Sequence, residues 1–214
     1  MFIDIHTHAD GTNEDQLAVH SIDLLAAQAL GESFSFSKYV SIGLHPWWAE
    51  QWNMDLQLKL ESVLLQTNVV FLGEIGIDNL CGVPLNLQKD VYFAQLEIAS
   101  NVRKPVLIHM VRSLETICAS KKQFPSIPAW IVHGFRGKPR EVLRLVDLGF
   151  YLSFGMGFNH QSVACCPIES LFLETDDSNI DLNNLYMEVA NIKGVSVSLL
   201  EQQVKRNFFA ICTK

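Results

Sequence analysis

The feature that most constrains this chain is a regular alternation of short apolar runs with longer segments of helical periodicity. Such alternation is typical of βα units arranged around a parallel sheet. Eight strands separated by helices predict a TIM-like (β/α)8 barrel of the α/β class, and a doubly wound open sheet is the competing layout. The eight expected strands are Phe2–Ile5, Leu17–Ile22, Tyr39–Leu44, Val69–Leu72, Val106–Ile108, Ala129–Val132, Tyr151–Phe154 and Leu171–Leu173.

Helical periodicity is clearest in five segments, and one expected strand competes with a helix. Residues 14–30 could form a single helix in place of the second strand. The expected helix after Pro139 stops at Gly149, and Ser198 with Glu201 fits a capping box at the start of the last helix. The five helices are Met54–Gln66, Leu87–Asn101, Arg140–Leu148, Asp181–Ile192 and Ser198–Ile211.

Length and composition bound the class of protein. The 214 residues predict one domain over 1–214, somewhat compact for a fold that usually takes about 250 residues. No apolar run is long enough to cross a membrane, and the first residues do not resemble a signal peptide, so we expect a cytoplasmic protein. The five cysteines are odd in number and lack a C-x-x-C pair, which favours reduced thiols over disulfides or a zinc ribbon.

The net charge of −7 argues against a broad basic surface for duplex nucleic acid. This sum omits bound metal ions, however, and two divalent cations would add four positive charges at one place. The acidic balance is therefore compatible with a phosphorylated substrate.

Reactive side chains recur at the expected carboxyl ends of the strands. In a (β/α)8 barrel these ends meet around one mouth, where active sites lie, so residues far apart in sequence should converge there. The residues in question are His6, His8, His45, Glu74, His109, His133 and Asp176.

These residue types suit a metal site. His6 and His8 are two apart, so on a strand both imidazoles point to the same face and can bind one ion. Glu74 stands in an apolar run, where an acidic side chain is costly unless it is paired or bound to metal, and its two oxygens can bridge two ions. A lone histidine after a strand is usually structural, but His109 and His133 occupy this position in successive units, which favours ligation.

Other residues near the expected mouth have candidate roles in catalysis or substrate binding. Asp176 is a candidate general base, with Glu174 as its rival. His45 could bind metal, although donation to a substrate phosphate is our preferred interpretation. Its neighbours in the same loop, Trp47, Trp48 and Trp52, could stack on nucleobases or simply pack together. Asp4 could hydrogen-bond a ligand histidine or cap its strand, and Asp78 could support a loop.

With these residues in place, the pattern resembles the TatD family of metal-dependent deoxyribonucleases in the amidohydrolase-like superfamily. Each motif alone is weakly specific, but their order across nearly the whole chain is highly specific. Gln88, Phe93 and Gln95 and the closing stretch Val189–Phe209 add to the similarity. The matching motifs are Asp4–His8, Gly43–Pro46, Gly73–Asp78, Lys104–His109, Val132–Gly137 and Leu173–Asp176.

The resemblance implies a barrel with two divalent cations and hydrolysis of DNA phosphodiester bonds, in a single strand or at an end. One ion would be held by the first two histidines and the other by the last two, with Glu74 bridging them and Asp176 binding the first ion and helping to activate water. The implied ligands are His6, His8, Glu74, His109, His133 and Asp176. Imidazole and carboxylate together suit zinc, manganese, iron or magnesium.

The sequence departs from the family mainly at positions that contact substrate. The family's arginine two residues after the fifth-strand histidine is absent, and Arg112 stands one position later. We expect Arg112 and His45 to neutralise the substrate phosphate. A small-molecule phosphoesterase, an amidohydrolase using the same centre, or a non-catalytic metal-binding scaffold are the alternative functions.

Overall fold

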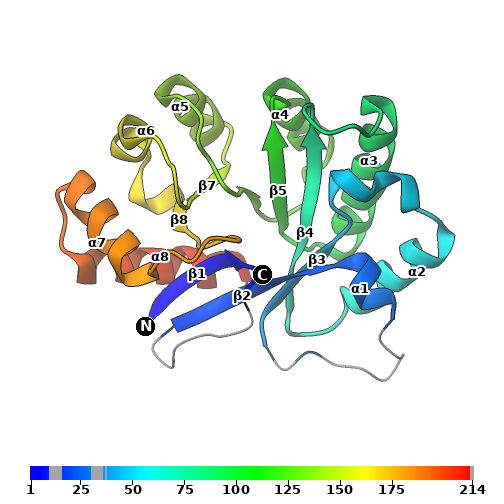
Figure 1. Cartoon of the computed structure of the whole chain (residues 1–214), viewed down its shortest axis with the longest axis horizontal. Coiled ribbons are helices and arrows are strands. Elements are labelled where there is room, and N and C mark those ends of the chain that lie inside the picture. The colour runs from blue at the N-terminus through cyan, green and yellow to red at the C-terminus, as the bar shows by residue number, and fades with distance from the viewer. Residues whose placement is uncertain (10–15, 30–35, 37, 213–214) are drawn as a thin grey trace. The chain divides into compact units, whose positions relative to one another are not determined.

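In the computed structural model, which describes residues 1–9, 16–29, 36 and 38–212, eight strands form one sheet in the order β1 to β8 (Figure 1). The strands are β1 (Phe2–Thr7), β2 (Gln16–Asp23), β3 (Val40–Gly43), β4 (Val69–Asp78), β5 (Val106–Val111), β6 (Trp130–Val132), β7 (Tyr151–Phe154) and β8 (Leu171–Leu173). The helices are α1 (Leu24–Gln28), α2 (Met54–Val63), α3 (Leu85–Val102), α4 (Leu114–Gln123), α5 (Pro139–Asp147), α6 (His160–Cys165), α7 (Leu182–Lys193) and α8 (Val197–Cys212), with 3-10 turns η1 (Pro46–Gln51) and η2 (Ile168–Ser170).

The last strand returns to lie beside the first. Thr7 in β1 forms a parallel bridge with Asp176, directly after β8, and the backbone N–H of Asp176 donates to the carbonyl of His6 at 2.9 Å. The pairings of β1 with β2, β3 with β4, β4 with β5, β6 with β7 and β7 with β8 are parallel. Strands in sequential order whose first and last members are neighbours make a (β/α)8 barrel, so that prediction is confirmed and the open-sheet alternative is wrong.

Several strands are longer than the sequence predicted. Strand β4 continues to Asp78 and β5 to Val111, so Glu74 and His109 lie inside strands rather than after them. His6 likewise lies within β1. The apolar runs mark only the buried part of each strand, whereas backbone pairing continues through the polar residues that follow.

Two local predictions near the chain ends are wrong. Residues 14–30 do not form one helix, because β2 occupies Gln16–Asp23 and α1 follows directly, with Asp23 accepting a hydrogen bond from the N–H of Leu25 at 2.7 Å. Helix α8 is capped by Ser196 rather than Ser198, since the Ser196 hydroxyl accepts from the N–H of Leu199 at 3.2 Å. Helices α1, α4 and α6 were not predicted, and α1 and α6, with 5 and 6 residues, are too short to show a helical period.

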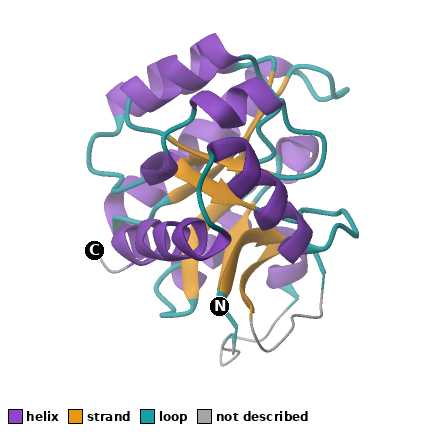
Figure 2. Cartoon of the chain, turned by 90° about the vertical axis from the view of Figure 1, so that its left-hand side faces the viewer, coloured by secondary structure: helices purple, strands orange, loops and turns teal. Residues whose placement is uncertain are grey.

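The chain divides into two compact units, of which the first comprises Met1–His20 and Ile131–Lys214. Figure 2, seen from the side of this unit, shows helices in front of the strands that they cover. Helix α8 packs on β1 and β8, and its Val204 and Phe208 are buried. The hydroxyl of Tyr186 in α7 donates to the carbonyl of Ile3 at 2.9 Å and accepts from its N–H at 3.1 Å, which fixes α7 against β1.

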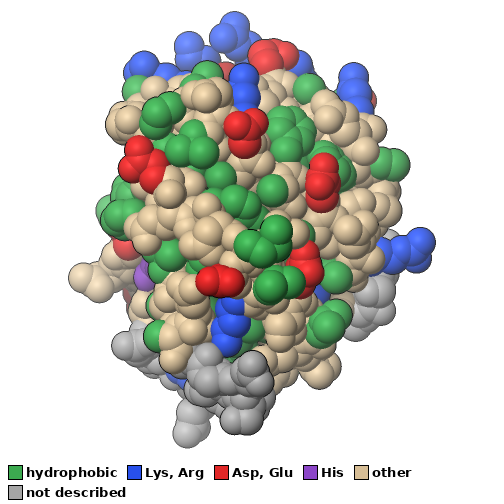
Figure 3. Space-filling view, turned by 90° about the vertical axis from the view of Figure 1, so that its right-hand side faces the viewer, with side chains coloured by type: hydrophobic (Ala, Val, Ile, Leu, Met, Phe, Trp, Pro, Cys, Tyr) green, Lys and Arg blue, Asp and Glu red, His purple; other side chains and the backbone are tan. Residues whose placement is uncertain are grey.

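The second unit, Ser21–Trp130, contains β3, β4 and β5 with α1 to α4. Figure 1 shows α3 running alongside β4, and the two are in contact. Exposed Met54, Leu58 and Leu65 belong to α2 or follow it, and in Figure 3 apolar and charged side chains are interspersed on the outer face of this unit. The prediction of a single domain over 1–214 stays a prediction. None of the described helices is both long and apolar enough to span a membrane.

Candidate active site

The first unit brings together three of the predicted ligands. His6, His133 and Asp176 each offer one ligand atom, and these atoms lie within 4.8 Å of one another. His6 Nε2 is 3.3 Å from Asp176 Oδ1, and the rings of His6 and His133 are 4.6 Å apart. His6 is fully buried, whereas the side chain of Asp176 is 28% exposed, so one ligand faces solvent from an otherwise enclosed group. We call these three residues the first cluster.

The backbone at Asp176 explains how the first cluster forms. Asp176 has a left-handed φ of 55°, a conformation that aspartate tolerates better than most residues. Its N–H donates to the carbonyl of His6 at 2.9 Å, and its carbonyl accepts from the N–H of His8 at 3.0 Å. The turn after β8 is thereby joined to the end of β1, which places the Asp176 carboxylate beside the histidines.

His8 and Asp4 lie at the edge of the same group. His8 Nε2 is 3.6 Å from Asp176 Oδ1, and its side chain is 44% exposed. Buried Asp4 accepts hydrogen bonds from the backbone N–H of His6 and from the N–H and hydroxyl of Thr175, so it contacts the backbone of His6. Burial raises the pKa of Asp4 to about 6, although the bonds from Thr175 oppose that rise.

Glu174, predicted as a rival general base, instead lies behind a histidine. It is fully buried, its Oε1 accepts from the N–H of Gly134 at 2.6 Å, and the same oxygen is 3.5 Å from His133 Nδ1. Its Oε2 accepts no hydrogen bond from any residue that the structure describes. A carboxylate near Nδ1 would favour the form of the histidine with hydrogen on Nδ1 and a lone pair on Nε2. Sequence spacing alone could not show this contact.

The second unit brings together a second set of three residues. His45, Glu74 and His109 offer ligand atoms within 4.8 Å of one another. His109 Nδ1 is 3.7 Å from Glu74 Oε1, and the rings of His45 and His109 are 4.4 Å apart. The side chain of Glu74 is only 10% exposed, so the acidic residue in the apolar run is indeed enclosed. We call these residues the second cluster.

Glycines in β4 allow the second cluster to assemble. A Cβ on Gly76, which has a φ of 151°, would lie 2.0 Å from the carbonyl oxygen of His109. A Cβ on Gly73 would lie 2.5 Å from the Cβ of Leu107. Both distances are far below van der Waals contact, so the two glycines beside Glu74 are required for β4 to approach β5 this closely.

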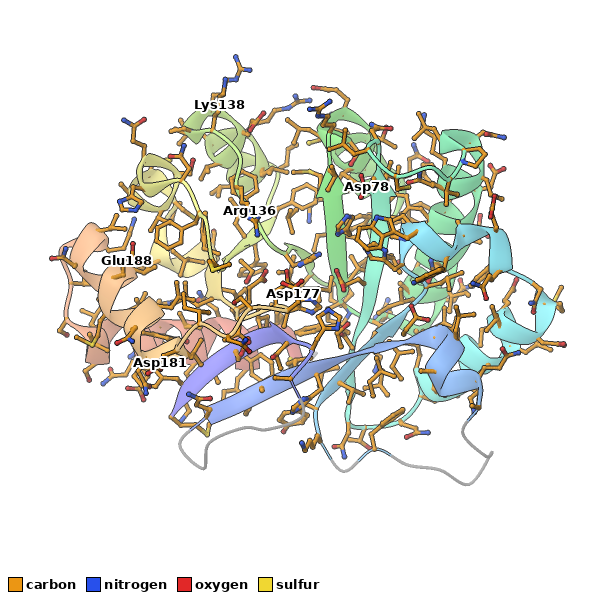
Figure 4. The ribbon with its side chains drawn as sticks, in the orientation of Figure 1. Asp78, Arg136, Lys138, Asp177, Asp181 and Glu188 are labelled. Carbon is orange, nitrogen blue, oxygen red and sulfur yellow. The ribbon has the colours of Figure 1, made fainter. Side chains whose placement is uncertain are left out.

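Asp78 joins the second cluster to an aromatic side chain. Its Oδ2 accepts from Trp47 Nε1 at 2.7 Å and lies 3.4 Å from His109 Nε2 (Figure 4 labels Asp78). Its Oδ1 accepts from the N–H of Leu80 at 2.8 Å, so it also supports the loop as predicted. Burial would raise the pKa of Asp78, but the hydrogen bonds from Trp47 and Leu80 outweigh burial and lower it. Asp78 therefore stays ionised beside His109.

His45 caps the turn η1 with its ring. Its Nδ1 accepts from the N–H of Trp47 at 3.3 Å, and Pro46 occupies the first position of the turn. A neutral imidazole that accepts at Nδ1 carries its hydrogen on Nε2. This tautomer makes Nε2 a donor, which fits contact with a phosphate oxygen better than ligation of a metal.

Two glutamines of α3 hold the strand ends that carry these residues. Gln95 accepts from the N–H of Leu44 at 2.8 Å and donates to its carbonyl at 3.1 Å, directly before His45. Gln88 does the same for Asp78, at 2.8 and 3.0 Å. Both glutamines are buried, so they fix the ends of β3 and β4 rather than contact substrate.

Arg112 follows β5 directly and is exposed. Its φ of 49° is left-handed, and its carbonyl accepts from the side chain of Asn79 at 2.6 Å. Its predicted contact with a phosphate stays a prediction.

Comparison with known proteins shows to which family the chain belongs. The family model for TatD-related DNases matches residues 12–213. The chain belongs to this family. The resemblance inferred from the motifs is thereby confirmed, and TatD membership makes the chain a metal-dependent hydrolase that acts on ester bonds.

Curated relatives and solved structures agree with this assignment. The chain is 26% identical to the 3′-5′ ssDNA/RNA exonuclease TatD of Pantoea ananatis, over 88% of this chain and 83% of that protein. It is 28% identical to the uncharacterized metal-dependent hydrolase YjjV of Escherichia coli K12, over 85% and 81%. The crystal structure of the TatD homologue YjjV from Escherichia coli K12 aligns with a TM-score of 0.84 at 21% identity, covering 100% of this chain and 98% of that one. A TatD-family hydrolase from Entamoeba histolytica aligns with a TM-score of 0.76 at 16% identity, covering 99% and 97%.

Proposed function

We propose that this chain is a nuclease that hydrolyses phosphodiester bonds of single-stranded DNA with two divalent metal ions. The observation that carries the proposal is that each compact unit gathers imidazole and carboxylate side chains from within its strands or directly after them, in a chain of the TatD family. The exonuclease named for single-stranded DNA and RNA among its relatives supports a nucleic-acid substrate.

The donor sets fit divalent metals. In the first cluster, His6 and Asp176 would hold one ion together with His8. In the second unit, His109 would turn its Nδ1 to the metal, because Nε2 faces the Asp78 carboxylate, which is the usual arrangement of a ligating histidine. Mixed imidazole and carboxylate donors suit zinc, manganese, iron or magnesium.

Three predictions complete the proposed centre. We expect His133 and His109 to hold the second ion, Glu74 to bridge the two ions, and Asp176 to help to hold the first. When bound, two divalent ions lower the pKa of a water molecule and polarise a phosphoryl oxygen.

The residues around the metals have separate roles in the reaction. Asp176, with a partly exposed carboxylate, accepts the proton that the attacking water loses. His45 donates from Nε2 to a non-bridging phosphate oxygen, and Arg112 adds positive charge from the end of β5. Glu174 and Asp78 do not touch the substrate and act by orienting His133 and His109.

The experiment that tests this function measures metal content and hydrolysis together. Protein purified without chelators should contain about two metals per chain, and it should cleave single-stranded DNA until a chelator is added. Glu74→Gln should lose both metal and cleavage. His45→Gln should keep its metal but raise KM roughly 10-fold or more, as expected for losing a hydrogen bond to a charged group.

Other outcomes would redirect or overturn the proposal. Metal without cleavage of any nucleic acid would point to small phosphoesters or to amides as substrates. A protein that holds no metal, and takes up none when manganese, zinc or magnesium is supplied, would contradict the proposed centre altogether. Retention of metal and turnover in Glu74→Gln would show that Glu74 is not the bridging ligand.

We also propose a cytoplasmic location and a single working domain. The odd number of cysteines and the lack of a C-x-x-C pair favour reduced thiols, which are usual in a reducing compartment. The family match over residues 12–213 draws on both compact units, which supports one domain.

A further inference from the structure

The turn η1 after β3 carries two neighbouring tryptophans that are both half exposed. Trp47 is 52% exposed and Trp48 45% exposed, although tryptophan is usually well buried. Packing of the aromatic rings within this loop, the other interpretation of the sequence, leaves about half of each side chain open to solvent. An exposed aromatic ring beside a catalytic cluster is a candidate contact for substrate.

Trp47 is held in place, and it is held against the second cluster. Its Nε1 donates to Asp78 at 2.7 Å, its backbone N–H donates to His45, and its ring lies edge-on to that of His45 at 4.8 Å. The ring of His109 is 6.4 Å away. Asp78 thus contacts both a candidate metal ligand and the indole, so the two are positioned by one carboxylate.

Trp48 has none of these constraints. Its backbone N–H donates to the carbonyl of His45 at 2.9 Å, but within the described parts of the chain its side chain makes no hydrogen bond or ring contact. Two tryptophans of similar exposure, adjacent in sequence, therefore differ in one respect: only the indole of Trp47 is fixed beside the histidines. This pair provides a matched internal control.

We propose that Trp47 is a stacking platform for a nucleobase next to the phosphodiester that is hydrolysed. A flat π face stacks on any base, so it selects single-stranded nucleic acid over small phosphoesters without selecting a sequence. A ring already fixed by Asp78 loses little conformational freedom when a base stacks on it. This inference rests on the proposed nuclease function and specifies the substrate that the site accepts.

The test measures binding rather than turnover. Fluorescence anisotropy at one fixed salt concentration would compare labelled phosphorothioate oligodeoxynucleotides that carry a base or an abasic site at each successive position. The wild-type protein should prefer the base at one position by about 5- to 150-fold, the range expected for stacking on an aromatic side chain. Trp47→Leu should lose that preference, whereas Trp48→Leu should keep it, and both variants should retain wild-type metal content.

A conservative variant keeps the test informative if Trp47→Leu does not fold. Trp47→Phe keeps an aromatic face but cannot donate to Asp78, so it should retain part of the preference for a base. If Trp47→Leu loses its folded circular dichroism spectrum, a reduced preference for a base in folded Trp47→Phe would still support the fixed indole, and an unchanged preference would contradict it.

The outcomes separate this inference from the function on which it rests. Cleavage of single-stranded DNA by the wild-type protein with no preference for a base at any position would overturn the stacking role and leave the nuclease intact. Loss of the preference in Trp48→Leu but not in Trp47→Leu would overturn the assignment to Trp47. Failure of the wild-type protein to cleave or bind any nucleic acid would overturn both proposals.

Discussion

In each unit a carboxylate lies beside a candidate ligand histidine, but the two carboxylates have different hydrogen-bond partners. In the first unit, Glu174 faces His133 and takes its hydrogen bond from the backbone N–H of Gly134. In the second, Asp78 faces His109 and takes a hydrogen bond from the half-exposed indole of Trp47. One carboxylate is tied to the protein interior and the other to a surface that substrate can reach. If both units hold metal as proposed, this difference gives the second unit an additional role in contacting substrate.

The strongest way to test this comparison is to remove one histidine from each unit. His133→Ala and His109→Ala should each lose bound metal and lower hydrolysis by more than about 100-fold, since loss of an outer partner alone costs 10- to 100-fold. Metal content by elemental analysis and kcat/KM on single-stranded DNA would measure both effects. His160→Ala is the control, because His160 is 70% exposed and pairs with Glu188 outside both clusters.

If only one of the two variants lost metal and activity, the proposal that both units bind metal would be contradicted. If His109→Ala kept its full metal content, the second cluster would serve substrate alone, and the proposed pair of ions would reduce to one.

Replacing the carboxylates beside the two histidines, Glu174 and Asp78, should show whether only the second unit affects substrate binding. Glu174→Gln and Asp78→Asn should each weaken metal affinity by roughly 10- to 100-fold, because each orients a ligating histidine. Only Asp78→Asn should also raise KM for single-stranded DNA, since Asp78, unlike Glu174, accepts a hydrogen bond from the Trp47 indole. Metal titration followed by steady-state kinetics at saturating metal would distinguish the two effects. An equal rise in KM for Glu174→Gln would show that the proposed division of roles is wrong.

Two buried side chains hold a strand residue in each unit, and they allow a smaller, structural test. Tyr186 bonds both backbone groups of Ile3, and Gln95 bonds both backbone groups of Leu44. Burial raises the pKa of Tyr186 far above its ordinary value, so its hydroxyl keeps the proton that it donates. Tyr186→Phe and Gln95→Leu should each lower the free energy of unfolding by about 2 kcal/mol, because backbone groups are left buried without partners.

The same two variants should differ in activity. Gln95→Leu should also raise KM, because Leu44 directly precedes His45, whereas Tyr186→Phe should leave KM unchanged. Urea unfolding and steady-state kinetics on the same preparations would measure both quantities. A change in KM for Tyr186→Phe alone would reverse the roles assigned to the two units.

Much of the fold followed from the sequence because its signals are local. Apolar runs and helical periodicity located all eight strands, including Tyr151–Phe154 and Leu171–Leu173 with the bounds that the structure has. The candidate ligands were found because each stands at or near the end of an apolar run. Strand ends were misjudged at Glu74 and His109, because backbone pairing continues after the apolar residues stop.

The contacts that distinguish the units could not be predicted in the same way. Trp47 and Asp78 are 31 residues apart and lie in different segments, and Gly134 and Glu174 are 40 apart. Such pairs depend on how strands are placed in the barrel, and no local pattern encodes them. Exposure of Trp47 likewise depends on the turn that His45 caps.

Replacing one helix cap in each unit should give the smallest expected effects. The cap of α8 was predicted at the wrong residue. Asn53 caps α2 in the second unit by accepting from the N–H of Leu56 at 3.0 Å, and Ser196 caps α8 in the first by accepting from Leu199 at 3.2 Å. Asn53→Ala and Ser196→Ala should each lower the free energy of unfolding by about 1 kcal/mol. Ser198→Ala should change it by less than about 0.5 kcal/mol, because Ser198 lies inside the helix and alanine is favoured there. A larger loss for Ser198→Ala than for Ser196→Ala in urea unfolding would mean that α8 starts later and that the sequence-based cap was correct.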